Sequence, residues 1–192
     1  YARIIEKLTA SLEARGVTCR AGQPVLDIAP AGRGGVAVRT PAGREVYDHV
    51  VVTAPGDHAA RMCSGLTGAE RDRLAALKYQ GVVCASVVLK KPLRGRYLTY
   101  VADETIPFTG VIEMTAVVDR ETFAGHTLVY LPHYLPAHHP LFDTDDEAIR
   151  QSCIANLRKM YRHIDEDDVV AFRVSRARNV MAVQALNYSK AV

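Results

Sequence analysis

The sequence predicts an α+β fold that combines a β-meander, a second β-sheet and several helices. Three observations support this class. Strand-like runs separated by turn residues fill 25–53, valine-rich strand-like runs recur between 81 and 131, and a strong helical pattern follows at 144–160. The chain has 192 residues, 48% hydrophobic and 23% charged, so it can bury the core of one domain, or of one domain and part of another.

The first predicted element is an amphipathic helix over 1–15. Ile4, Leu8 and Leu12 recur at helical spacing, and Gly16 follows at the position where a left-handed residue commonly ends a helix. A short strand is expected directly afterwards, at 17–20.

Residues 25–53 are predicted to form a β-meander of three or four strands. The turn-forming segments 31–34 and 41–44 separate the strands, and 48–53 is the last of them. The glycines of the first turn do not indicate a phosphate-binding loop, because strand-like sequence lies on both sides of them. A dinucleotide loop connects a strand to a helix. The 192 residues contain no GxGxxG pattern.

Thr67 and Glu70 have the spacing of a capping box, which predicts a short helix after the meander. The valine-rich segment 81–89 predicts a strand covered on both faces. Further strands of the second sheet follow, expected at 97–102, 110–117, 126–131 and 169–174.

The strongest helical pattern starts at Thr144, where Thr144 and Glu147 form a second capping-box spacing. Ile149, Cys153 and Leu157 recur on one face of this helix. We therefore expect it to cover one side of the second sheet.

Composition excludes several classes of function. The net charge of +3 is too balanced for a nucleic-acid-binding protein, and no apolar run approaches the ~20 residues of a membrane-spanning helix. The four cysteines have no paired spacing, which argues against a disulfide framework or a zinc cluster and favours a reducing, cytoplasmic location. The chain starts with Tyr1 and not with Met, so we expect it to begin inside a longer protein.

Three polar side chains of the second sheet are candidates for a substrate pocket: Glu113, Tyr130 and His133. Strand residues alternate between the two faces of a sheet, so such polar groups either line a pocket or lie on a solvated face, and the residues leave both alternatives open. His133, His138 and His139 lie close in sequence, but no cysteine or well-spaced carboxylate joins them, so no metal site is predicted. Catalytic residues are not evident.

Seven segments, in this order along the chain, resemble the FAD-dependent amine oxidase superfamily, and in particular oxidoreductases similar to protoporphyrinogen oxidase and UDP-galactopyranose mutase. They include DHVVVTAP, IPFTGVIE and LVYLPHYLP, and the full set is 12–16, 25–28, 48–55, 77–79, 106–113, 128–136 and 173–177. The resemblance extends over most of the chain. It departs at Ala182, where the family often has a proline, and the absence of tryptophan leaves no indole cage for an amine.

The resemblance implies that the chain is an internal part of a flavoenzyme, without the amino-terminal GxGxxG unit and the carboxyl-terminal FAD segment. Residues 1–66 would belong to a split FAD-binding domain, 67–177 to a substrate-binding domain with a mixed β-sheet backed by helices, and 178–192 to a segment returning towards the FAD domain. The meander would lie against the adenine half of FAD. Within it, backbone groups of Val25 and the strand end Thr53, Ala54 and Pro55 would contact the cofactor.

The expected function is therefore the middle, substrate-binding portion of a FAD-dependent oxidoreductase that acts on a small molecule. FAD would be bound by the full-length protein, and the isolated chain is expected to bind none and to be inactive. The expected partners are the FAD-domain segments of the same polypeptide, with a homodimer as one alternative. A stand-alone ligand-binding or scaffolding domain without cofactor is the alternative function.

Overall fold

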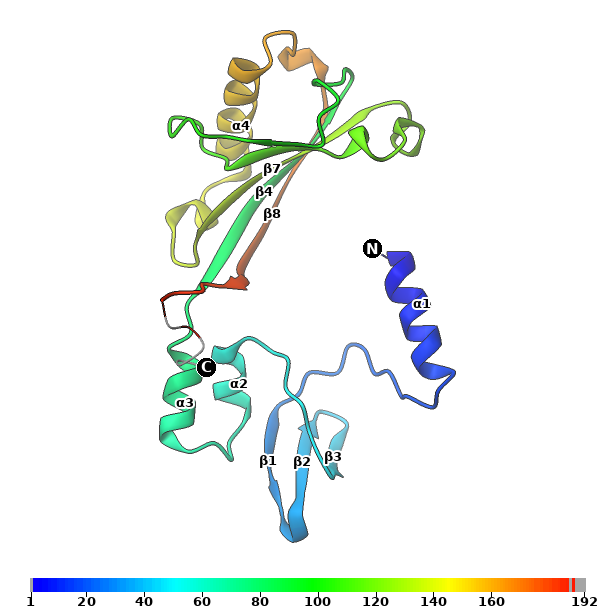
Figure 1. Ribbon diagram of the computed structural model, residues 1–192, viewed down its shortest axis with the longest axis vertical. Coiled ribbons are helices and arrows are strands. Elements are labelled where there is room, and N and C mark those ends of the chain that lie inside the picture. The colour runs from blue at the N-terminus through cyan, green and yellow to red at the C-terminus, as the bar shows by residue number, and fades with distance from the viewer. Residues whose placement is uncertain (1, 187, 189–192) are drawn as a thin grey trace. The chain divides into compact units, whose positions relative to one another are not determined.

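The computed structural model describes residues 2–186 and 188, and the chain divides into two compact units that part between Leu77 and Lys78 (Figure 1). The first unit contains the predicted helix and meander, and the second contains a five-stranded sheet with its covering helix. The α+β class is thus confirmed. No helix in the described part of the chain is both long enough and apolar enough to cross a membrane.

The first unit begins with α1 (Ala2–Glu13), as the helical spacing predicts. Gly16 ends the helix in the left-handed conformation, with φ of 82°, and the Val17 N–H returns to the Leu12 carbonyl at 3.1 Å. The apolar face of α1 is open, because Ile4 and Ile5 are 66% and 62% exposed. The strand expected at 17–20 is absent from the structure.

The meander consists of β1 (Asp27–Ala31), β2 (Gly35–Thr40) and β3 (Gly43–Tyr47), which pair antiparallel in that order. The glycine-rich segment forms a single 3-10 turn, η1 (Gly32–Gly34), between β1 and β2. The interpretation of this segment as a hairpin turn is therefore correct.

The fourth strand expected at 48–53 is not formed. These residues have no ladder partner among the described residues, and Val51 is 87% exposed. A strand needs hydrogen bonds from a neighbouring strand, so a valine-rich sequence alone does not create one. Two helices follow, α2 (Gly56–Met62) and α3 (Gly68–Ala75), and the Thr67 capping box of α3 is present as predicted.

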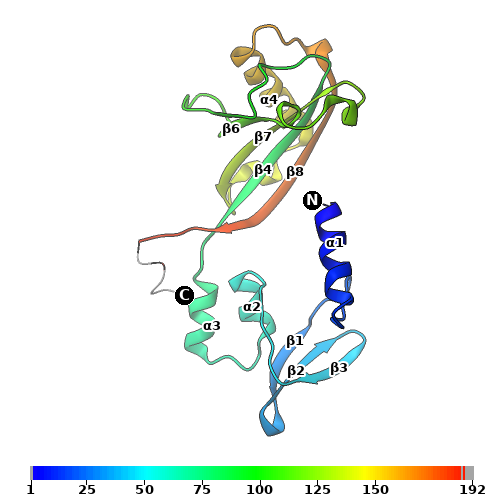
Figure 2. The ribbon, with the colours of Figure 1, turned by 45° about the vertical axis from the view of Figure 1, so that its right-hand side comes forward.

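The second unit is a sheet with strand order β5-β6-β7-β4-β8 (Figures 1 and 2). Its strands are β4 (Tyr79–Leu89), β5 (Leu98–Tyr100), β6 (Gly110–Glu113), β7 (Thr127–Pro136) and β8 (Val169–Ala182). Short 3-10 turns occupy the connections, at Met114–Ala116, Arg120–Phe123, Pro140–Asp143 and Glu166–Asp168.

The expectation of a mixed sheet is wrong, because every described ladder of this sheet is antiparallel. A helix does connect β7 to β8, and such crossovers join strands that run in the same direction. Strands β7 and β8 do run in the same direction, but β4 lies between them and pairs antiparallel with both, so no two neighbouring strands in the described sheet are parallel.

The crossover helix α4 (Asp146–Met160) covers one face of the sheet. Its N-cap is Asp145, one residue after the predicted Thr144, and the Asp145 carboxylate accepts the N–H groups of Glu147 and Ala148 at 2.8 and 3.4 Å. The buried face of α4 carries Ile149 and Leu157 and packs in the same core as the strand residues.

The strands of the sheet therefore have two different faces. In β4 the residues Val83, Ala85, Val87 and Leu89 are buried and face α4, whereas the intervening residues are half-buried and face the opposite side. We call these two sides the helix face and the open face. The prediction for 81–89 is a strand covered on both faces; in the described chain its helix face is buried and its open face is half-buried.

Strand β7 is longer than the predicted 126–131 and contains two prolines, Pro132 and Pro136. The Pro132 carbonyl points away from β4 and accepts the N–H of Thr109 at 2.9 Å. In an antiparallel ladder the N and C=O of one residue point to the same side, so the missing N–H of Pro132 costs no bond to β4.

Candidate functional site

A row of five side chains crosses the open face of the sheet at one level. Strand register places Ile112 of β6 opposite Tyr130 of β7, Tyr130 opposite Ser86 of β4, and Ser86 opposite Arg173 of β8, while Leu98 of β5 completes the row beside Ile112. Directly opposed residues have neighbouring side chains. The row therefore changes from apolar at β5 to hydroxyl groups in the middle and a guanidinium at β8.

A hollow lies beside this row, above β5, β6 and β7. It has about 610 Å³ of empty space including its open mouth, and its lining is largely aromatic and apolar. The lining residues are Leu98, Tyr100, Thr109, Gly110, Ile112, Pro132 and Tyr134. Such a surface suits a flat or extended apolar molecule.

Arg173 differs from the other arginines of β8. Arg176 and Arg178 bind Asp146 and Asp143, each at 2.6 Å. Arg173 is exposed and makes no hydrogen bond or ion pair with any described residue. Within the described strands it is the one charged side chain of the open face.

The three predicted substrate-pocket residues do not share a face. Tyr130 lies on the open face, in the row with Ser86 and Arg173. Glu113 pairs with Val129, and His133 pairs with Val83, so both belong to the helix face. The structure does not bring the three side chains together.

Glu113 is 3% exposed and holds a loop in place. Its carboxylate accepts the backbone N–H groups of Leu93, Arg94 and Gly95 at 3.0, 3.1 and 2.8 Å. Both carboxylate oxygens are thereby used inside the protein, which favours a structural role over contact with a substrate.

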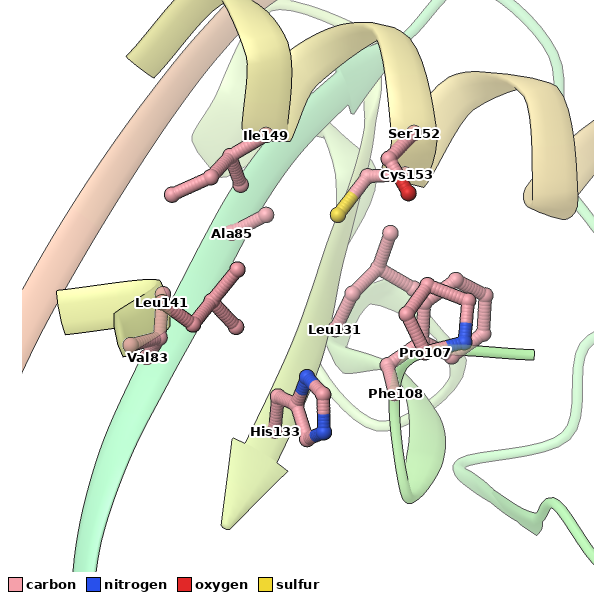
Figure 3. Close-up of a pocket in the computed structure, with 10 residues that line it drawn as sticks. All are labelled: Val83, Ala85, Pro107, Phe108, Leu131, His133, Leu141, Ile149, Ser152 and Cys153. Atoms are coloured by element: carbon pink, nitrogen blue, oxygen red, sulfur yellow. The ribbon is translucent and has the colours of Figure 1, made fainter. Parts of the chain in front are cut away.

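His133 lines a second, narrower pocket between β7 and α4 (Figure 3). The other walls are apolar apart from Ser152 and the thiol of Cys153, which projects from α4 between Ala85 and Leu131. Burial and the neighbouring ring of His139, whose centroid is 6.3 Å away, lower the pKa of His133, so its imidazole is neutral at neutral pH. Burial raises the pKa of Cys153 to about 12, so its thiol is protonated. No group of three or more potential metal ligands gathers anywhere in the described chain.

The residues expected to contact FAD lie in the first unit, at the start of the meander and before α2. The backbone N–H and C=O of Val25 make no backbone hydrogen bond with a described residue, although the next residue, Leu26, donates to Arg39 at 2.8 Å. The backbone groups of Thr53 and Ala54 likewise make no backbone hydrogen bond with a described residue, and Pro55 is the N-cap of α2. Free backbone donors and acceptors fit a cofactor that is held through the main chain.

Sequence reasoning missed Ser86 and Arg173 as candidate site residues. A signal exists for Arg173, because it is a single charged residue between Phe172 and Val174, which pack in the core. Its neighbours across the sheet depend on register, which the local sequence does not give.

Comparison with known proteins supplies further evidence. The model of the family "Flavin containing amine oxidoreductase" matches residues 1–188. A comparison with curated proteins finds no match. Among solved structures, a proposed protoporphyrinogen oxidase from Exiguobacterium sp. 255-15 superposes with a TM-score of 0.76 at 17% identity, covering 97% of this chain and 41% of that one.

Two more solved structures share the fold. An oxidoreductase from Methanosarcina mazei has a TM-score of 0.71 at 18% identity, and covers 92% of this chain and 42% of its own. A reduced UDP-galactopyranose mutase has a TM-score of 0.70 at 16% identity, with 93% and 39% covered. The chain thus spans about two fifths of the length of the structures it matches.

Proposed function

The chain belongs to the flavin containing amine oxidoreductase family, and on this premise we propose that it forms the substrate-binding portion of a FAD-dependent oxidoreductase. The match over 1–188 is the observation that carries the proposal. The shared fold supports it, because the matching solved chains are more than twice as long as this one and have room for the remaining parts of a cofactor site.

In this proposal the first unit supplies one wall of the FAD site. The free backbone groups of Val25 and of Thr53 and Ala54 would hold the cofactor, with Pro55 directing the chain into α2. When bound, the flavin supplies the electron-accepting chemistry. The protein's own contribution is to bind and orient.

The second unit would bind the substrate on its open face. Tyr130 and the hollow at β5, β6 and β7 offer a flat, largely apolar surface, and the opposite face is already filled by α4. Glu113 and His133 would stabilise the sheet from its helix face and would not contact the substrate directly.

The test is to express the complete coding sequence that contains these 192 residues and to record its absorbance after purification. We expect stoichiometric FAD in that protein and none in the 192-residue chain alone. A complete protein without flavin would contradict the proposal and would favour a stand-alone binding domain.

A further inference from the structure

We propose that Arg173 recognises an acidic group of the substrate, so that the enzyme acts on an organic anion and not on a cationic amine. The inference rests on the proposed function, because it assumes that the substrate lies on the open face. It adds the substrate class and a specificity-determining residue.

The first argument is the lack of an internal partner for Arg173. Among the described residues, the two other arginines of β8 each face a carboxylate, Arg176 that of Asp146 and Arg178 that of Asp143. Arg173 has no such partner among the described residues. A guanidinium presents a planar set of donors that matches a carboxylate or phosphate in a two-point contact.

The second argument concerns the side chains next to Arg173 on the open face. Ser86 is its direct neighbour across the ladder, and Tyr130 follows on the next strand. Neither hydroxyl makes a hydrogen bond with another described side chain, and both can donate to an anion. Three potential donors thus stand in one line on a face whose described strands carry no carboxylate.

The absence of acidic strand residues from this face also argues against a cationic substrate. An ammonium group would need a carboxylate or an aromatic cage for its charge. The tyrosines Tyr100, Tyr130 and Tyr134 are spread over three levels of the sheet, and Arg173 would repel an ammonium group at the level of Tyr130.

Strand spacing sets the length of the ligand. Pro132 and Tyr134 of the hollow are on β7, and β4 separates this strand from Arg173 on β8. Two strand spacings amount to about 10 Å. An apolar body the length of two rings with a terminal acid therefore reaches from the hollow to the guanidinium.

The test uses three probes with the same body and different head groups: biphenyl-4-carboxylate, biphenyl-4-methanol and biphenyl-4-methylamine. Binding to the complete protein is followed by the fluorescence of the biphenyl group, which does not require flavin, and flavin absorbance is read in the same samples. We expect the carboxylate to bind about 10-fold more tightly than the alcohol, as charge-assisted hydrogen bonds provide, and the amine to bind least.

Variants identify the residue responsible. Arg173→Gln should weaken the carboxylate about 10-fold and leave the alcohol unchanged, and Arg173→Lys should restore part of the loss. Arg176→Gln is the control, because it removes a guanidinium from the same strand on the helix face. Thermal unfolding verifies that each variant is folded.

Two results would overturn the inference: equal binding of the carboxylate and the amine, or carboxylate binding that Arg173→Gln leaves intact. Failure of the proposed function looks different. In that case the complete protein contains no flavin, while the preference for the carboxylate and its dependence on Arg173 persist.

Discussion

The carboxylate of Glu113 accepts the backbone N–H of Gly95 at 2.8 Å, across 18 residues of sequence. It also accepts the N–H groups of Leu93 and Arg94, so one buried side chain satisfies three backbone donors of the loop after β4. The residue that sequence analysis selected for a substrate pocket thus stabilises the start of β5.

This contact leads to the first prediction. Glu113→Ala should lower the free energy of unfolding by about 2–4 kcal/mol, because three partly buried N–H groups lose their acceptor. Urea unfolding monitored by circular dichroism measures the effect. Glu121→Ala is a suitable control, because Glu121 is an exposed glutamate outside the sheet. Equal stability of the two variants would contradict the structural role.

A second prediction concerns Gly81 on the helix face of β4. A Cβ at this position would lie 2.5 Å from the Phe142 ring and 2.7 Å from the Ala177 carbonyl. Gly81→Ala should therefore destabilise the second unit by about 1–3 kcal/mol. Gly68→Ala is the matched control, because nothing lies within 4 Å of a Cβ there and its change in stability should be near zero.

The third prediction concerns the pH dependence of stability. The N–H of Asp165 and the ammonium group of Lys91 lower the pKa of Asp168, with contacts of 2.9 and 3.0 Å. A carboxyl whose pKa is lowered in the folded state stabilises the protein at pH values above its unfolded-state pKa of about 3.9. This stabilisation is lost as the pH falls through the folded-state pKa. Asp168→Asn should therefore be less stable than the natural protein at pH 7, and the difference should shrink below about pH 4.

Unfolding midpoints measured from pH 3 to pH 8 check this expectation. Asp167→Asn serves as the control, because Asp167 is the exposed neighbour on the same turn. A stability difference for Asp168→Asn that stays constant over this pH range would show that the carboxylate charge is not responsible.

The fourth prediction distinguishes the cysteines by their reactivity. Cys19 is exposed, whereas Cys153 is buried beneath the sheet with a pKa raised to about 12. With 5,5′-dithiobis(2-nitrobenzoate) at pH 8, we expect one fast phase that Cys19→Ser abolishes. Cys153 should react only as fast as the second unit opens. Rapid labelling of Cys153 in the folded chain would contradict the packing of α4.

Local signals predicted local structure well. Gly16 ends α1, and the Thr67 capping box starts α3, because each involves residues within one helical turn. The prediction of a strand at 48–53 was wrong, because strand formation depends on a partner strand that the valines of this segment do not specify. The placement of the three candidate pocket residues on two different faces has a related cause. Ile112 pairs with Tyr130, so Glu113 must point to the other face, and this register is not readable from either strand alone.

The last prediction tests the proposed cofactor wall. In the complete protein, Val25→Asp and Ala54→Asp should each reduce FAD occupancy at least about 10-fold, because an unpaired carboxylate would be buried beside the cofactor. Val25→Ala should retain FAD, because the proposed contact uses the backbone N–H and C=O, which alanine keeps. Occupancy is measured from the ratio of flavin to protein absorbance. Full occupancy in both aspartate variants would place the cofactor away from the meander, whereas loss in Val25→Ala would show that the side chain and not the backbone makes the contact.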